Sequence, residues 1–235
     1  MATSAPAAPV DASPARRRAP AALRHLDCLR WGAVTAAGVL AARTPLDRVE
    51  AVAALGASAC VVHLSFAYND LCDAAADAAN PRRAPLTAAA RDALRSSATL
   101  AALLLPAFSA ALPLGAAAAF WAVAALGLAY SHPRLSLKAR PGWSQACHAA
   151  CAVLLFEGGR RALAGPSEAT ATLSAAYFAS FAVATSLAGE VQDLDSDAAA
   201  GLRTTAAHAG RARAHAATGL LHAGALALLP ALEPG

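Results

Sequence analysis

Residues 50–77 read EAVAALGASACVVHLSFAYNDLCDAAAD, an apolar run that ends in a group of carboxylates. The run 50–69 can cross a bilayer as a helix, because the hydrocarbon core takes about 20 residues. Asp70, Asp73 and Asp77 follow directly. If the helix continues, these carboxylates lie within an arc of about 60° on one face. Three like charges on one face repel one another unless a cation neutralises them. The stretch therefore predicts a membrane helix with a cation site at its end.

The composition of the whole chain also indicates a membrane protein. Of 235 residues, 57% are hydrophobic and 14% are charged, whereas about 25% are charged in an ordinary soluble domain. The apolar residues are mostly alanine and leucine in long blocks, which predict an all-α bundle of about seven spans. Pro106 and Pro113 are expected to kink or end the third span. The predicted spans are 24–43, 50–69, 96–113, 115–131, 144–159, 171–189 and 213–231.

Residues 1–22 are predicted to form a disordered cytosolic tail, because they are rich in Ala, Pro and Ser and lack apolar periodicity. Residues 23–235 are predicted to form one transmembrane domain. The net charge of +4 does not indicate nucleic-acid binding, since the basic residues sit in short clusters and only 5% of residues are aromatic. The five cysteines are interpreted as packing residues rather than as a disulfide framework.

The distribution of basic residues predicts the orientation of the spans. With the N-terminus in the cytoplasm, fifteen of the 19 Lys and Arg residues fall on inside segments. Only Arg43, Arg48, Arg160 and Arg161 fall on outside loops. Cytoplasmic loops of membrane proteins carry such an excess of Lys and Arg. We therefore expect an integral membrane protein whose N-terminus and acidic helix ends face the cytoplasm.

A second acidic group follows the sixth predicted span. Glu190, Asp193 and Asp197 repeat the i, i+3, i+7 spacing of the first group. Asp195 falls on the opposite helix face and is not expected to be a ligand. Carboxylates at this spacing provide the hard oxygen ligands that suit Mg²⁺. The alternative, that these acids merely cap span ends, does not account for the same spacing occurring twice.

The two acidic groups belong to a longer internal repeat. Asp70 and Glu190 are 120 residues apart, and the same offset relates Asp73 to Asp193, Asp77 to Asp197 and Arg83 to Arg203. It also superposes the first three predicted spans on the last three. Because the offset keeps span direction, the pattern predicts two parallel helical repeats, about 24–131 and 144–235, around a central cavity.

These motifs resemble the UbiA superfamily of intramembrane prenyltransferases. The family motif N-D-x-x-D-x-x-x-D matches Asn69, Asp70, Asp73 and Asp77. Its second motif, D-x-x-x-D followed by Gly and a basic residue, matches Asp193, Asp197, Gly201 and Arg203. Its tyrosine-serine-proline loop with a downstream lysine is similar to Tyr130, Ser131, Pro133 and Lys138. In this chain Ala84 interrupts an Arg-Pro-Leu run that often follows the first motif, and Gln192 stands where family members often have a basic residue. Family members usually have nine spans.

The resemblance implies that Mg²⁺ ions hold a prenyl diphosphate between the two acidic motifs. The implied metal ligands are Asp70, Asp73, Asp77, Glu190, Asp193 and Asp197, of which Asp70, Asp73, Asp193 and Asp197 are the expected catalytic residues. The expected substrate-binding residues are Asn69, Arg83, Tyr130, Lys138 and Arg203. Arg83, Lys138 and Arg203 would stabilise the leaving diphosphate.

The expected reaction is transfer of the isoprenoid group to a small, lipid-like or aromatic acceptor, which His63 and Asn69 are placed to contact. Three alternatives stay open. Ionisation of the same substrate can end in cyclisation, as in a membrane terpene cyclase. Carboxylates within a membrane also mark ion pathways in transporters. The chain can also be a catalytically silent homologue.

Overall fold

In the computed structural model, the described residues are 22–42, 47–79, 85–163, 169–199 and 201–229. Positions 22–25, 27, 76, 77 and 79 are described as backbone only. The described part of the chain is helical and contains no strand. The predicted N-terminal tail lies outside it, apart from Ala22, which begins the first helix. The elements are α1 (Ala22–Ala41), α2 (Arg48–Ala79), α3 (Ala88–Ala110), α4 (Leu114–Ser131), η1 (Leu137–Ala139), α5 (Trp143–Ala162), α6 (Ala169–Ala199), α7 (Thr205–Ala209) and α8 (Arg211–Leu228).

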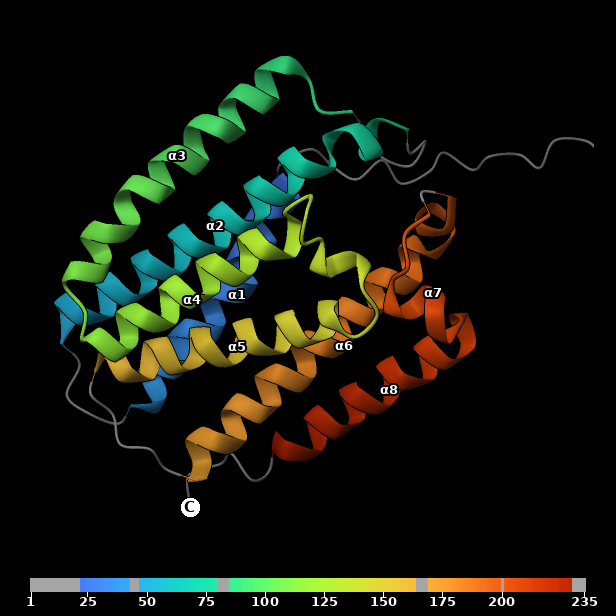
Figure 1. Cartoon of the computed structure of the whole chain (residues 1–235). Coiled ribbons are helices and arrows are strands. Elements are labelled where there is room, and N and C mark those ends of the chain that lie inside the picture. Colours follow the sequence, from blue (N-terminus) through green and yellow to red (C-terminus); the bar gives the residue numbers. More distant parts are fainter. Residues whose placement is uncertain (1–21, 43–46, 80–84, 164–168, 200, 230–235) are drawn as a thin grey trace, which may run out of the picture.

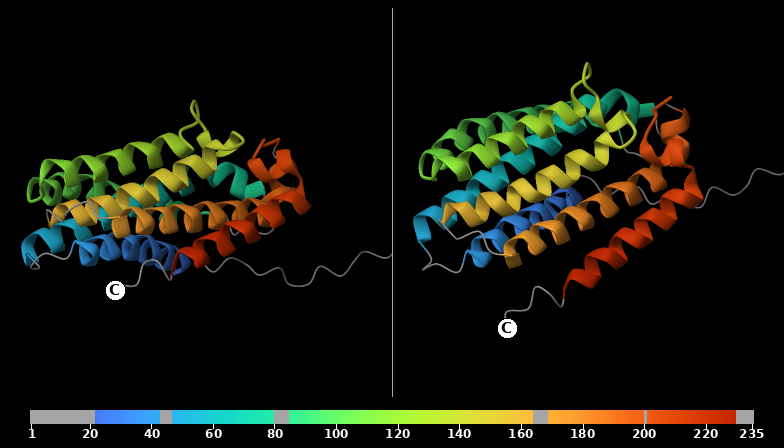
Figure 2. Two further views of the ribbon diagram at one scale, coloured as in Figure 1. Left: turned by 90° about the horizontal axis from the view of Figure 1, so that it is seen from below. Right: turned by 60° about the horizontal axis from the view of Figure 1, so that its bottom comes forward.

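The seven long helices of the described part of the chain lie side by side as a bundle (Figure 1), and the further views show the same arrangement (Figure 2). The predicted all-α multi-span bundle is thereby confirmed. Each of the seven predicted spans overlaps one long helix. Within the described residues, four helices are long and apolar enough to cross a membrane by length and composition, namely α2 over Arg48–Ala75, α3, α4 and α6. Helix α1 contributes the shorter apolar segment Cys28–Ala41, so for α1, α5 and α8 the crossing stays a prediction.

The helix bounds follow the internal repeat of 120 residues. Shifting α1 and α2 by this offset gives 142–161 and 168–199, within one residue of α5 (Trp143–Ala162) and α6 (Ala169–Ala199) at each end. The shift of α3 gives 208–230, which contains α8. Helices related by the offset run in the same direction (Figure 1). Helices α3 and α8, the last of each set, lie at opposite edges of the bundle and pack on α2 and α6 respectively.

Helix α5 is the central element of the bundle. It packs against α1, α2, α4 and α6. Two glycines let α1 and α5 approach closely, because a Cβ at Gly38 would overlap the carbonyl oxygen of Phe156 and a Cβ at Gly159 would overlap that of Thr35. The backbones of the two repeats therefore touch where these helices cross. The same hydrophobic core contains the fully buried side chains of Phe120, Phe156, Leu105, Leu155 and Val61.

Pro106 does not end its helix. Helix α3 continues through Pro106 to Ala110, and Pro113 is the N-cap residue of α4. A proline removes one backbone donor and fixes one φ angle, which a helix in a packed bundle tolerates. The sharp turn between the two helices is formed by residues 111–113 instead.

Candidate active site

The acidic end of α2 lies at the end of the bundle where α4 and α6 also terminate and α5 begins (Figure 1). Asp70 is buried, with 8% of its surface exposed. Asp73, one turn later, forms an ion pair with Lys138. The same ammonium group donates to Asn69 Oδ1 at 3.3 Å. Ser131 Oγ also donates to Asn69 Oδ1, at 2.6 Å. The structure thus brings three predicted residues, Asn69, Asp73 and Lys138, into one hydrogen-bonded group.

The loop after α4 positions Lys138 by reversing direction twice. The backbone carbonyl oxygen of His132 accepts from the backbone N–H of Ser136 at 2.7 Å, and Ser136 adopts the left-handed conformation with φ 41°. The short helix η1 then carries Lys138 back towards α2. Arg134, on the outer part of this loop, is exposed. The loop therefore separates two cations that lie close in sequence, and only Lys138 reaches the acidic end of α2.

The acidic end of α6 lies at the same end of the bundle. Asp193 and Asp197 are half-buried. Asp195 points away: its side chain is 68% exposed and accepts from Arg211 at 2.8 Å. Glu190 accepts from Gln145 of α5 and from the backbone of α7. Asp193 and Asp195 are thus in different surroundings although they are two residues apart.

A polar and aromatic group joins α1, α4, α5 and α6 near this end. The hydroxyl groups of Tyr130 and Ser144 lie 3.3 Å apart, and those of Ser144 and Ser186 lie 3.2 Å apart. The ring of His148 lies edge-on to Tyr130 with centroids 5.3 Å apart, and 6.0 Å from Trp31. His148 Nδ1 donates to the Ser144 carbonyl at 2.8 Å, which assigns the proton to that nitrogen. Tyr130 is therefore held by its neighbours close to the predicted site.

Ser144, Ser186, Gln145 and Thr205 were not predicted from the sequence. They belong to no recognisable motif, and only the packing of α5, α6 and α7 brings them together. His63, predicted to contact the acceptor, bonds with Ser97 Oγ at 2.9 Å through Nε2 and so joins α2 to α3.

Two of the predicted site residues have no described side chain. Arg83 lies outside the described residues, and Asp77 is described as backbone only, at the end of α2. Arg203 is exposed and lines a hollow of about 250 Å³ with Leu202, Ala207 and His208. Among the side chains that are described, no three His, Cys, Asp or Glu residues are close enough together to form a metal site.

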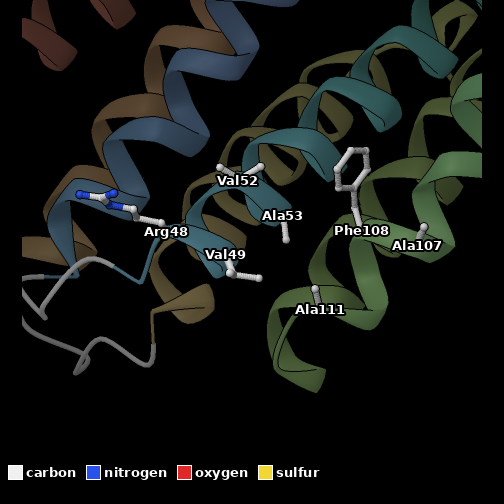
Figure 3. A pocket seen from close by; sticks show the side chains of 7 residues that line it. All are labelled: Arg48, Val49, Val52, Ala53, Ala107, Phe108 and Ala111. Atoms are coloured by element: carbon white, nitrogen blue, oxygen red, sulfur yellow. The ribbon is translucent and has the colours of Figure 1, made fainter.

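A larger hollow of about 360 Å³ lies at the other end of α2, where Val52 and Ala53 face Phe108 of α3 (Figure 3). Arg48 at its rim is 22 residues from Asp70, or about 33 Å along a helix. Its wall is otherwise apolar, and it is completed by Val49, Ala107 and Ala111. This hollow is therefore remote from the carboxylates.

The sequence matches the profile of the UbiA prenyltransferase family over residues 31–234. The structure is similar to that of a UbiA homologue from Archaeoglobus fulgidus bound to GPP and Mg²⁺, with a TM-score of 0.66 and 22% identity over 89% of this chain and 76% of that chain. An apo structure of a UbiA homologue from Aeropyrum pernix K1 has a TM-score of 0.72 and 22% identity over 89% of this chain and 81% of that chain. At this identity the likeness shows the fold. A comparison with curated proteins finds no significant match.

Proposed function

This chain belongs to the UbiA prenyltransferase family, and we propose that it transfers an isoprenoid group from a prenyl diphosphate to a hydrophobic or aromatic acceptor within the membrane. The observation that carries the proposal is the group formed by Asn69, Asp73 and Lys138. A cation and carboxylates held together at one end of an apolar bundle suit a substrate with an anionic head and an apolar tail.

The proposed metal is Mg²⁺, which is present with GPP or DMAPP in two structures of the Archaeoglobus fulgidus homologue. The donor set fits this ion, because carboxylate oxygens are hard ligands and Mg²⁺ takes one or two of them together with substrate phosphates and water. The proposed ligands of the Mg²⁺ ions are Asp70, Asp73 and Asp77 of α2 and Glu190, Asp193 and Asp197 of α6. When bound, Mg²⁺ would neutralise charge that develops on the leaving diphosphate.

The protein's own cations would complete the binding of the diphosphate. Lys138 is already held at the acidic end of α2, and Arg83 and Arg203 are proposed to flank it from corresponding positions of the two repeats. Fixed cations aimed at the leaving group stabilise the charge that forms as the allylic C–O bond breaks. The electron pair of that bond leaves with the diphosphate, and the acceptor forms a new bond to the allylic carbon and loses a proton.

The apolar part of the bundle would house the isoprenoid tail and keep water from the allylic cation. Tyr130, held by Ser144 and by the edge of His148, would line this part of the site. We propose that the site opens to the cytoplasm and that the N-terminus lies on the same side. The excess of Lys and Arg on the corresponding segments supports this orientation.

Product analysis of the purified protein tests the proposal. The protein is incubated with Mg²⁺ and labelled GPP or DMAPP, with and without phenolic or lipid-like acceptors. We expect a prenylated acceptor together with inorganic diphosphate. A cyclised hydrocarbon formed without any acceptor would identify a terpene cyclase instead. Intact substrate under all conditions would contradict an enzymatic role and favour the transporter or silent-homologue alternatives.

A further inference from the structure

Each carboxylate oxygen of Glu190 accepts a hydrogen bond from a neighbouring helix. Its Oε1 accepts from Gln145 Nε2 at 2.9 Å, and its Oε2 accepts from the backbone N–H of Ala206 at 3.0 Å. One donor belongs to the first turn of α5 and the other to α7. The carboxylate therefore joins three helices, with each oxygen directed at a neutral donor of the protein.

Two further hydrogen bonds close this arrangement into a network. Thr205 Oγ1 donates to Gln145 Oε1 at 2.5 Å, and the backbone N–H of Gly142 donates to Thr205 Oγ1 at 2.8 Å. The amide of Gln145 donates one of its two N–H bonds to the Glu190 carboxylate and accepts the Thr205 hydroxyl on its oxygen. The contact between the hydroxyl groups of Ser144 and Ser186, which lies one turn before Glu190 on α6, also joins α5 to α6.

The network holds the segment that connects α6 to α7. Gly201 in this segment has φ 70°, which favours glycine, and Thr204 caps α7 by accepting from the backbone N–H of Ala207 at 3.3 Å. Between them lies Arg203, one of the proposed diphosphate-binding residues. The bond from Ala206 to Glu190 attaches α7, the helix that follows Arg203, to α6. The bond from Gln145 to Glu190 attaches α5 to α6.

We infer that Glu190 is a positioning residue that fastens the Arg203 segment to α5 and α6, and that it is not a metal ligand. This inference rests on the proposed function and narrows its ligand set to the aspartates. The helical repeat alone cannot make this distinction, because it pairs Glu190 with Asp70. A glutamate is one methylene longer than an aspartate, which lets its carboxylate reach across to α5 and α7.

The test separates metal binding from positioning by two readouts on the full chain in detergent. The first is the affinity for Mn²⁺ in the presence of inorganic diphosphate. We expect Glu190→Gln and Gln145→Leu to bind Mn²⁺ within about twofold of the unmodified protein, and Asp193→Asn to bind it at least tenfold more weakly. The matched control is Gln192→Ala, because Gln192 is exposed in the same turn of α6. A tenfold loss in Glu190→Gln would overturn the inference.

The second readout needs neither metal nor catalysis. Ala207, exposed on α7, is replaced by cysteine in a background without the native cysteines and carries a nitroxide label. The mobility of this nitroxide label should rise in Glu190→Ala and in Gln145→Leu, and should stay unchanged in Asp193→Asn. Glu190→Gln keeps an acceptor for the Ala206 N–H, so it should be intermediate.

An unchanged label in both Glu190→Ala and Gln145→Leu would contradict the positioning role. If the unmodified protein binds no Mn²⁺ under these conditions, the proposed metal-dependent function fails. The label still decides whether Glu190 fastens the segment, so the two failures are distinguishable.

Discussion

Lys138 is paired with Asp73, a residue that lies 65 positions earlier in the chain. Their side chains are 20% and 24% exposed respectively, so the pair is shielded from solvent more than a surface ion pair is. The fold creates this relationship, because α4 returns the chain to the end of α2 and η1 turns Lys138 inward. The pair joins the first acidic motif to the loop between the repeats, which is where the proposed leaving group would bind.

Replacing Lys138 tests whether this cation serves the substrate. Lys138→Met should lower kcat/KM for the prenyl diphosphate about 10- to 100-fold, because a hydrogen bond to a charged group contributes about 1.5–3 kcal/mol. Lys138→Arg should recover part of the loss. Arg140→Ala is the control, since Arg140 is exposed at the end of η1. Steady-state kinetics of diphosphate release measure the effect, and equal losses at both positions would mean that overall charge matters rather than this contact.

Asp193 and Asp195 offer a comparison within one turn of α6. Asp193→Asn should reduce turnover at least a thousandfold, whereas Asp195→Asn should stay within about threefold, because Asp195 is exposed and paired with Arg211. The chain should remain folded in both variants, as judged by gel filtration in detergent. If the Asp195 variant lost as much activity as the Asp193 variant, the assignment of helix faces would be wrong.

Much of this arrangement could be predicted from the sequence. The predicted spans 144–159 and 171–189 lie within α5 and α6, and the offset that relates Asp73 to Asp193 also relates the observed bounds of α1 and α2 to those of α5 and α6 within one residue. The bonds of Glu190 to Gln145 and Ala206 could not be predicted. They depend on how α5 packs on α6 and on where the chain turns into α7, which no local pattern encodes. The course of α3 through Pro106 likewise depends on packing in the bundle.

The crossing of α1 and α5 predicts that two glycines are needed for stability. Gly38→Ala should destabilise the protein by about 1–3 kcal/mol, because the new methyl group would overlap the carbonyl oxygen of Phe156. Gly159→Ala should destabilise the protein similarly, because its methyl group would overlap the carbonyl oxygen of Thr35. Gly32→Ala on the same helix is the control, since a Cβ there would meet nothing within 4 Å. Thermal unfolding in detergent measures the difference, and a Gly38 variant as stable as the Gly32 variant would refute the close crossing.

The proposed orientation predicts one-sided labelling. Single cysteines at positions 83, 138 and 203, in a chain whose five native cysteines are replaced, should react with an impermeant thiol reagent only from the cytoplasmic side. The parallel repeat puts the first and last of these positions in corresponding places. Labelling of position 83 from one side and position 203 from the other would contradict both the parallel repeat and the shared site.

Release of inorganic diphosphate from GPP by the purified protein, in the presence of an acceptor that it prenylates, tests the proposed metal-dependent site most sharply. We expect Mg²⁺-dependent release that stops in EDTA and resumes when Mg²⁺ is restored, since both acidic helix ends need a cation to bind an anionic substrate. We also expect that Asp73→Asn and Asp193→Asn, one from each repeat, each abolish this release. Undiminished release in EDTA, or full activity after either substitution, would contradict a metal-dependent site shared by the two repeats.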